Sequence, residues 1–291
     1  WLLGQAEERG AEILRARALA IYPGELPSIL TAHERFEADL VVVATGVNSR
    51  TPLDASWGYR HPKTETMAQD EVPFPLGLLG RNVHIFLDYP PGLFFGALIP
   101  KGQYVNISLL GKDLALDAVK DFIEGHVLYH LFPEGVPLLC GCTPRVAISP
   151  ARGYYADRMV AIGDAAVTRL YKDGIGSAFI TAEAAAQTSI EQGITKAAFR
   201  RGYAPTCCKI ARDNYFGQLL FSIWLTPGPK TSLLESWLKP FMNREQSHNE
   251  QLCRRALWAL FTGDEPYRQV FLTALRYWVS TRLLRFMRPT R

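Results

Sequence analysis

Residues 158–176 combine residue types and spacing that point most directly to ligand chemistry. A short apolar run ends at Gly163 and Asp164, and the sequence Gly174-x-Gly176 then precedes a stretch of small residues. This order is typical of a strand that leads through a glycine-bearing turn into a helix, the arrangement of many nucleotide sites. We expect Asp164 to accept hydrogen bonds from sugar-like hydroxyls, and the amides of the helix start to face a charged or carbonyl-rich ligand. The alternative is that Asp164 only caps the helix.

Lys172 and Asp173, next to this turn, are the charged residues that could act in catalysis. A lysine can stabilise an anionic ring or a carbonyl oxygen, and an aspartate can move a proton. The alternative is an ion pair on a surface turn. His126 and His130 have the spacing of two metal ligands on a helix, but no third ligand can be identified, so we expect no metal site.

The elements that must position this turn can be located from apolar patterns. Residues 38–46 form a second apolar run that ends in glycine, which is typical of a parallel strand covered on both faces. Three segments between the two runs predict an antiparallel sheet: residues 82–87, 93–99 and 104–110. Turns are expected at 90–92 and 100–103.

The remaining segments are expected to surround this framework. Short strands at 12–14, 18–22 and 28–32 predict a small meander. Residues 51–80, rich in proline, glycine and charge, are expected to lie outside the core. A helix capped by Asp113 should run to about residue 131, and the chain should be helical from 195 onward, with breaks at 227–229 and 263–264.

The composition indicates a globular protein with one large or two modest domains, since 48% of the 291 residues are hydrophobic and 21% are charged. No apolar run is long enough to span a membrane, and no signal peptide is recognisable, so we expect a cytoplasmic protein. The five cysteines include no Cys-x-x-Cys pair, and their odd number predicts reduced thiols. Residues 2–10 resemble the end of a helix, from which we infer a missing N-terminal portion.

Positive charge is concentrated at the C-terminus, where residues 266–291 hold six arginines and no acidic residue. Such an end can attract anionic lipid or nucleic acid. We expect no nucleic-acid partner, and peripheral membrane contact through this arginine-rich end is a hypothesis. The alternative is a solvated C-terminal helix.

Three segments together carry a resemblance to a known family. They are 39–50, an apolar strand with Thr45, Gly46, Ser49 and Arg50; 92–102 with Asn106, an aromatic strand ending in Pro-Lys-Gly; and 163–176, Gly-Asp-Ala-Ala with Gly-x-Gly. In their order and spacing, residues 1–200 resemble the FAD-dependent oxidoreductases of the p-hydroxybenzoate hydroxylase superfamily, and especially its geranylgeranyl reductase-like branch.

The resemblance implies an α/β (α+β) fold in three parts. Residues 1–50 and 151–194 would form a Rossmann-like FAD/NAD(P)-binding domain without its N-terminal βαβ unit. Residues 51–150 would form an inserted antiparallel-sheet substrate domain, and residues 195–291 a C-terminal helical region. The Gly-x-Gly-x-x-Gly fingerprint of such domains is absent from the sequence, so we expect it in the missing portion.

The resemblance also implies which residues contact the cofactor. Asp164 would hydrogen-bond the ribityl chain of FAD, and the backbone of Gly174, Ile175 and Gly176 would approach the isoalloxazine and pyrophosphate. The same cofactor-binding set includes the strand-end residues Thr45, Gly46 and Gly163. Only glycine lets the backbone come this close to a ligand.

Departures from the family pattern favour one branch. Thr45 stands where the hydroxylases usually carry aspartate, and Val167 where many carry histidine; residues 95–100 lack both tryptophans of the halogenase pattern. The sequence therefore predicts an FAD-dependent oxidoreductase that acts on an apolar substrate, isoprenoid or another lipid, by hydride transfer through the flavin, with NAD(P)H as a candidate electron donor. The alternatives are an FAD-dependent monooxygenase and, in another class, a non-catalytic remnant or lipid-binding module.

Overall fold

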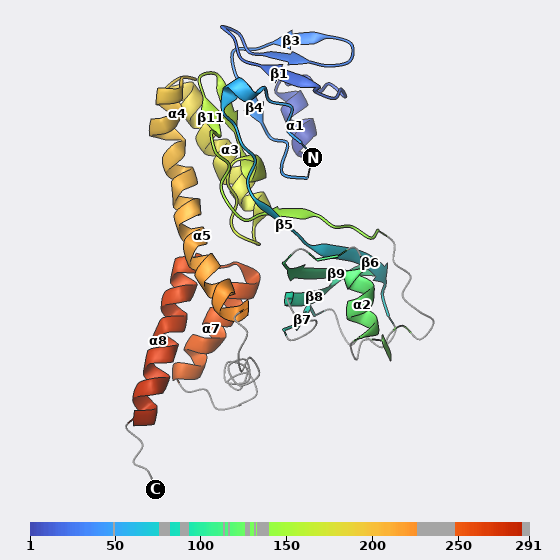
Figure 1. The fold of residues 1–291 in the computed structure, drawn as a ribbon, viewed down its shortest axis with the longest axis vertical. Helices are drawn as coiled ribbons and strands as arrows, with labels where there is room; N and C mark the ends of the chain where they lie inside the picture. The colour runs from blue at the N-terminus through green and yellow to red at the C-terminus, as the bar shows by residue number, and fades with distance from the viewer. Residues whose placement is uncertain are drawn as a thin grey trace.

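The computed structural model describes most of the chain, namely residues 1–48, 50–75, 82–87, 93–112, 114–115, 117–125, 129–130, 132, 140–225 and 248–286, with only the backbone of 223–225, 248–249 and 281–286. Figure 1 shows a small sheet with helices at one end of the long axis, a larger sheet toward the other end, and a long helix extending between them. Several expected features lie outside the described residues: Ser49, the turn at 90–92, the cap Asp113, His126, the break at 227–229, and Arg288 and Arg291.

One of the two three-stranded sheets, called the smaller sheet below, joins the two apolar runs. Strand β4 (Val41–Val43) pairs in parallel with β12 (Met159–Ala161), and β11 (Tyr155–Ala156) pairs antiparallel with β12. All three residues of β12 are fully buried, because the strand is covered on both faces. Val43 lies opposite Ala161, so both strands end at the same edge of the sheet. The prediction of a parallel strand at 38–46 is confirmed, but the expected cover on both of its faces is wrong, because β4 is an edge strand and Val42 is 49% exposed.

The N-terminal meander is present, but with different strands. After helix α1 (Leu2–Glu8) it contains β1 (Ala20–Tyr22), β2 (Ser28–Leu30) and β3 (Arg35–Glu37), paired in that order and antiparallel. The expected strand at 12–14 is wrong, since residues 11–19 have no regular structure. The third strand lies at 35–37 because the Thr31 hydroxyl accepts a hydrogen bond from the Glu34 amide at 3.0 Å and so reverses the chain.

The larger sheet has four antiparallel strands in the order β6-β9-β8-β7. Their bounds are β6 (Ala68–Pro73), β7 (His84–Phe86), β8 (Leu93–Lys101) and β9 (Tyr104–Gly111). The expected antiparallel sheet is therefore confirmed. The expectation that residues 51–80 lie outside the core is wrong, because Ala68 and Val72 of β6 belong to the core of this sheet.

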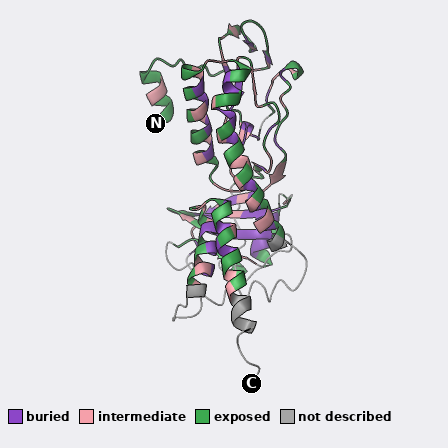
Figure 2. Ribbon diagram, turned by 90° about the vertical axis from the view of Figure 1, so that its left-hand side faces the viewer, coloured by how far each residue is buried: buried purple, intermediate pink, exposed green. Residues whose placement is uncertain are grey.

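Both faces of the four-stranded sheet are covered. On one face, Phe122 and Ile123 of helix α2 (Ala118–Glu124) pack against Leu98 and Val105. On the other face, a bulge between Leu93 and Phe95 lets the neighbouring Phe94 and Phe95 enter the same cluster, which includes Phe221 and Tyr267 from the helices. Figure 2 shows buried residues in this sheet, and others on the helices at the opposite end of the molecule.

A two-stranded ribbon connects the two sheets. Strand β5 (Thr64–Thr66) leads toward the four-stranded sheet, and β10 (Arg145–Ala147), antiparallel to it, returns (Figure 1). The short 3-10 helix η1 (Ala55–Trp57) precedes this ribbon, and its Trp57 donates a hydrogen bond to the Ile21 carbonyl at 3.1 Å. The chain thus leaves the smaller sheet and returns to it, as the resemblance implied.

Helices make up the described chain after residue 195, as expected. They are α4 (Lys196–Gly202), α5 (Ala204–Leu225), α7 (His248–Thr262) and α8 (Tyr267–Phe286), which follow α3 (Gly174–Glu191). The predicted break at 263–264 is confirmed, because α7 ends at Thr262 and α8 begins at Tyr267. Within the described residues, no helix is long and apolar enough to cross a membrane.

The expectation of reduced thiols is wrong for one pair of cysteines. Cys140 and Cys142 form a disulfide, whereas Cys207, Cys208 and Cys253 are thiols. A positive φ at the intervening glycine brings the two Cα atoms to 5.4 Å, a separation that a disulfide spans. The sequence Cys-Gly-Cys is compatible with this turn. The prediction of reduced thiols rested on the odd number of cysteines in the chain, which carries no information about a single close pair.

Candidate functional site

Gly163 brings the end of β12 against helix α3. It opens the 3-10 helix η3 (Gly163–Ala165) with φ +57°, and its amide donates to the Thr181 hydroxyl at 2.8 Å. A Cβ at this position would lie 3.2 Å from the Cβ of Ala178. Both the backbone conformation and the close approach therefore require glycine here.

Asp164 does not cap a helix. The cap of α3 is Asp173, whose carboxylate accepts a hydrogen bond from the Gly176 amide at 3.1 Å. Within the part of the chain that the structure describes, the Asp164 carboxylate makes no hydrogen bond and no ion pair. Its alternative role as an N-cap is therefore excluded, and its oxygens are available to a ligand.

Thr168 joins Asp164 at the start of α3. A Cβ added to Gly174 would lie 3.7 Å from Oδ1 of Asp164 and 3.9 Å from Oγ1 of Thr168. The Thr168 hydroxyl is buried and has no hydrogen-bond partner among the described residues. Two polar side chains thus converge on a position that has no side chain of its own. The sequence analysis did not identify Thr168, because a threonine four residues after Asp164 carries no distinguishing signal.

The start of α3 adds backbone donors to this group. The amides of Gly174 and Ile175 are at the first positions of the helix and have no acceptor within it. The helix dipole makes this end attractive to anionic or carbonyl oxygens. Ile175 itself is 90% exposed, so its side chain is available to a ligand or to another surface.

The neighbouring strand end supplies Thr45 and Gly46. Gly46 has φ +65°, and the Thr45 hydroxyl lies 2.6 Å from the Thr51 hydroxyl. The amide of Thr51 donates to Nε2 of His61 at 3.2 Å, and burial lowers the pKa of that histidine. Of the seven expected cofactor-binding residues, Thr45 and Gly46 follow β4, Gly163 and Asp164 follow β12, and Gly174, Ile175 and Gly176 begin α3. The ends of β4 and β12 lie side by side, and Asp164 lies next to Gly174. The cofactor contacts themselves stay predictions.

Lys172 faces the helices α7 and α8 instead. Its Nζ donates to the Phe261 carbonyl at 2.7 Å and lies 4.5 Å from the centre of the Phe95 ring. Burial, aided by the nearby Arg169, lowers the pKa of Lys172 to about 8. Arg169 donates in the same direction, to the carbonyls of Gly263 and Glu265. The catalytic roles expected of Lys172 and Asp173 stay predictions, and both side chains have a clear structural role.

Comparison with known proteins adds structural relatives but no close sequence relative. No protein-family model matches the sequence, and neither does any curated protein. A geranylgeranyl bacteriochlorophyll reductase-like protein from Thermoplasma acidophilum is similar in structure with a TM-score of 0.67 and 15% identity, over 95% of this chain and 73% of that one.

Two further solved structures have the same fold. An anhydrotetracycline hydroxylase from Streptomyces rimosus matches with a TM-score of 0.56 and 16% identity, over 82% of this chain and 52% of that one. A flavin-dependent halogenase, CmlS, matches with a TM-score of 0.53 and 14% identity, over 96% and 58%. The chain therefore has the Rossmann-like α/β fold that these reductase-like, hydroxylase and halogenase structures share, as the sequence resemblance implied.

Proposed function

We propose that this protein is an FAD-dependent oxidoreductase and that the edge formed by β4, β12 and the start of α3 holds the flavin. The observation that carries the proposal is the convergence of Asp164 and Thr168 on Gly174, with neither side chain bonded within the described residues. A buried hydroxyl without a partner destabilises a protein unless a ligand satisfies it. The fold that the chain shares with a reductase-like protein, a hydroxylase and a flavin-dependent halogenase supports the same conclusion.

The chemistry of these residues fits a flavin. Asp164 offers an anionic acceptor to the ribityl hydroxyls, and Thr168 offers a hydroxyl that can donate or accept. The amides of Gly174 and Ile175 can donate to carbonyl oxygens of the ring or to phosphate oxygens. When bound, the cofactor would supply the two-electron chemistry, and this chain would hold and orient it.

The finer part of the proposal concerns the substrate, which we take to be apolar, isoprenoid or another lipid, with NAD(P)H as the electron donor. Thr45 and Val167 in place of the hydroxylase residues support a reductase, and Val167 is buried in a hydrophobic cluster. The aromatic residues Phe94 and Phe95 are packed by the protein's own helices and do not line an open space. A monooxygenase is the second enzyme candidate, because a hydroxylase has the same fold.

The first experiment is the absorbance spectrum of the full protein, purified and then supplied with FAD. We expect a bound flavin, and Asp164→Ala should weaken its binding by about 10- to 100-fold, the effect of removing a hydrogen bond to a charged group. Asp121→Ala is the matched control, because Asp121 is an exposed carboxylate on α2, in the other sheet domain. Absence of flavin in the wild type, even with added FAD, would instead support a non-catalytic lipid-binding module.

The second experiment separates the two enzyme candidates. The loaded protein is given NAD(P)H and an isoprenoid lipid, with and without oxygen. A reductase forms reduced lipid without oxygen, whereas a monooxygenase consumes oxygen in proportion to hydroxylated product. Stoichiometric hydroxylation would reverse our order of preference.

Contact with a membrane surface is a further part of the proposal, which would give access to a lipid substrate. Arg268, Arg276 and Trp278 are exposed on α8, a combination of cations and an aromatic ring suited to an anionic interface. We expect flotation with vesicles that contain anionic lipid, and release by salt. Binding that is equal for neutral vesicles and insensitive to salt would contradict an electrostatic contact.

A further inference from the structure

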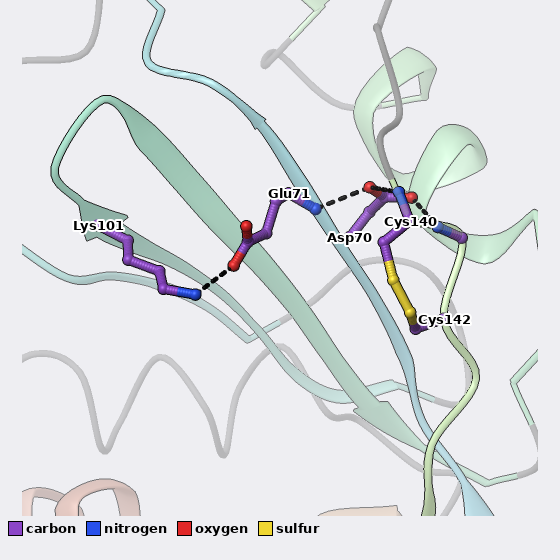
Figure 3. The surroundings of a disulfide bond; sticks show 6 residues. Asp70, Glu71, Lys101, Cys140 and Cys142 are labelled. Atoms are coloured by element: carbon purple, nitrogen blue, oxygen red, sulfur yellow. Dashed lines mark hydrogen bonds and ion pairs between the residues drawn. A yellow bond between two sulfur atoms is a disulfide. The ribbon is translucent and has the colours of Figure 1, made fainter.

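The disulfide Cys140–Cys142 closes a tight loop beside strand β6 of the four-stranded sheet (Figure 3). The two cysteines are separated by 2 positions, and Gly141 between them has φ +59°. Both cysteines are exposed, so a reagent or a partner protein can reach them from solvent. This exposure distinguishes them from Cys207 and Cys253, which are buried.

Asp70 holds the backbone of this loop. Its buried carboxylate accepts hydrogen bonds from the amides of Cys140 at 2.9 Å and Gly141 at 2.5 Å (Figure 3). It also accepts one from the Glu71 amide at 2.7 Å. Hydrogen bonds to a carboxylate are stronger than those between neutral groups. The position of the first cysteine is therefore set by β6 through bonds that do not involve sulfur.

The second cysteine is held by the same strand. The amide of Cys142 donates to the Gln69 carbonyl at 3.0 Å, and the Gln69 amide donates to the Cys142 carbonyl at 2.9 Å. Consequently both cysteines keep their places on β6 whether or not the sulfur atoms are bonded. Two thiols fixed in this way have a high effective concentration for each other, which favours rapid closure of the ring.

The bond contributes little to holding the fold together. A disulfide stabilises mainly by restricting the unfolded chain, and the effect grows with the length of the closed loop. Here the loop contains one residue between the cysteines. A bond of this kind can open without unfolding the protein, and exposed disulfides are the ones that exchange readily.

We propose that Cys140 and Cys142 form a redox-active dithiol–disulfide site whose partner is a dithiol reductant. A thiolate of the external dithiol attacks one sulfur of the Cys140–Cys142 bond, which breaks as a mixed disulfide forms. The second thiol of the reductant then attacks this mixed disulfide. The chain gains two electrons and two protons as two thiols, and the reductant leaves as a disulfide. Asp70 is the positioning residue that keeps the two sulfur atoms within bonding distance.

The test is a redox titration of the folded protein in mixtures of reduced and oxidised dithiothreitol, followed by alkylation and mass spectrometry. We expect the peptide with residues 140–142 to pass from no label to two labels in one step, with unchanged far-UV circular dichroism. The exposed Cys208 should be labelled at every ratio, and the buried Cys207 and Cys253 at none. Two labels on the 140–142 peptide even in fully oxidised buffer, or labels that appear only when the helices melt, would overturn the proposal.

Two substitutions on adjacent residues of β6 separate positioning from general effects on the strand. Asp70→Asn removes the charged acceptor, so the ring should open at a ratio of reduced to oxidised reagent about tenfold lower than in the wild type. Glu71→Gln is the matched control, because Glu71 contacts Lys101 at 2.5 Å on the other side of the strand and should leave the ratio unchanged. If the ring opens at the same ratio of reduced to oxidised reagent in both variants, the role of Asp70 is refuted. Cys142→Ser calibrates the labelling, because its Cys140 should carry one label at every ratio.

Discussion

Asp164 and Gly174 face each other across the turn that joins β12 to α3, and a methyl group or a ligand atom placed on Gly174 would contact the Asp164 carboxylate at an ordinary van der Waals distance. A Cβ built on Gly174 would lie 3.7 Å from Oδ1 of Asp164. The backbone of Gly174 does not have positive φ, so alanine is compatible with its conformation. Neither backbone strain nor a clash with the described residues requires glycine at this position, and in the proposed function the bound flavin occupies the space beside it.

Gly174→Ala should separate cofactor binding from folding. We expect the unfolding free energy to change by less than about 0.5 kcal/mol, as for an ordinary surface substitution, while the dissociation constant of FAD rises about tenfold or more because the methyl group occupies ligand space. Urea unfolding and flavin titration measure the two quantities. Gly4→Ala is the matched control, since a Cβ there meets nothing within 4 Å. Unchanged FAD affinity in Gly174→Ala would contradict the site.

Thr168→Val should weaken FAD binding without weakening the apo protein. Valine has nearly the same shape as threonine, and the hydroxyl that it removes is buried without a partner in the described part of the chain. We expect the apo protein to be equally stable or more stable by about 1 kcal/mol. Thr181→Val is the contrasting control, because its hydroxyl accepts from Gly163 and donates to Ser177, and its loss should destabilise by about 1–2 kcal/mol. Thermal unfolding with and without FAD measures both effects.

The sequence was sufficient to predict the parts of the fold that depend on local pattern. The mainly apolar runs before Gly46 and Gly163 indicated strands, with a parallel strand expected at 38–46, and the structure pairs Val41 in parallel with Met159. It was not sufficient for β6, where a buried Asp70 interrupts the apolar pattern. Two of the three amides that donate to this carboxylate come from residues 70 and 71 positions later, a contact that no local pattern contains.

The same limit applies to the candidate site. Asp164 and the glycines have types and spacing that indicate a ligand, whereas Thr168 is significant only because its hydroxyl is left without a partner in the folded chain. Lys172 was expected to face the ligand because it adjoins Gly174 in sequence. The positive φ of Tyr171 and Asp173 changes the direction of the chain on both sides of it, and its amino group contacts α7.

Lys172→Met should alter the pH dependence of stability. Burial lowers the pKa of Lys172 from 10.5 to about 8, so between these values the unfolded chain binds more protons and stability rises with pH. This gain in stability is absent below about pH 8, where Lys172 is charged in the folded protein as well as in the unfolded chain. Methionine removes the titration, so the difference in unfolding free energy between wild type and variant should shift in favour of the wild type from pH 8 to pH 10.5. Urea unfolding across this range measures it, and a constant difference would contradict the burial of the amino group.

Arg169→Ala should loosen the pair of helices α7 and α8. The guanidinium donates to the carbonyls of Gly263 and Glu265 and lies 4.7 Å from the centre of the Tyr267 ring. Its removal leaves two carbonyls at the turn without this donor, at a cost of about 2–3 kcal/mol. Hydrogen exchange should rise in residues 250–280 and stay unchanged in β12. Arg255→Ala is the control, because its contact with Glu265 is on the exposed side of the same turn, where an ion pair contributes little to stability.

Gly96→Ala should overpack the contact between β8 and helix α2. A Cβ at Gly96 would lie 3.0 Å from the ring of Phe122 and 3.1 Å from Cδ2 of Leu109, closer than side chains normally approach. We expect destabilisation of about 1–3 kcal/mol, the usual effect of an extra methyl group in a filled core. Phe122→Leu alone should also destabilise, because it leaves a cavity. In the double variant the added methyl group enters the space that the ring vacated, so its loss of stability should be smaller than the sum of the two single losses, with a coupling of about 1 kcal/mol. Strict additivity in urea unfolding would show that the strand and the helix are not in contact at Gly96.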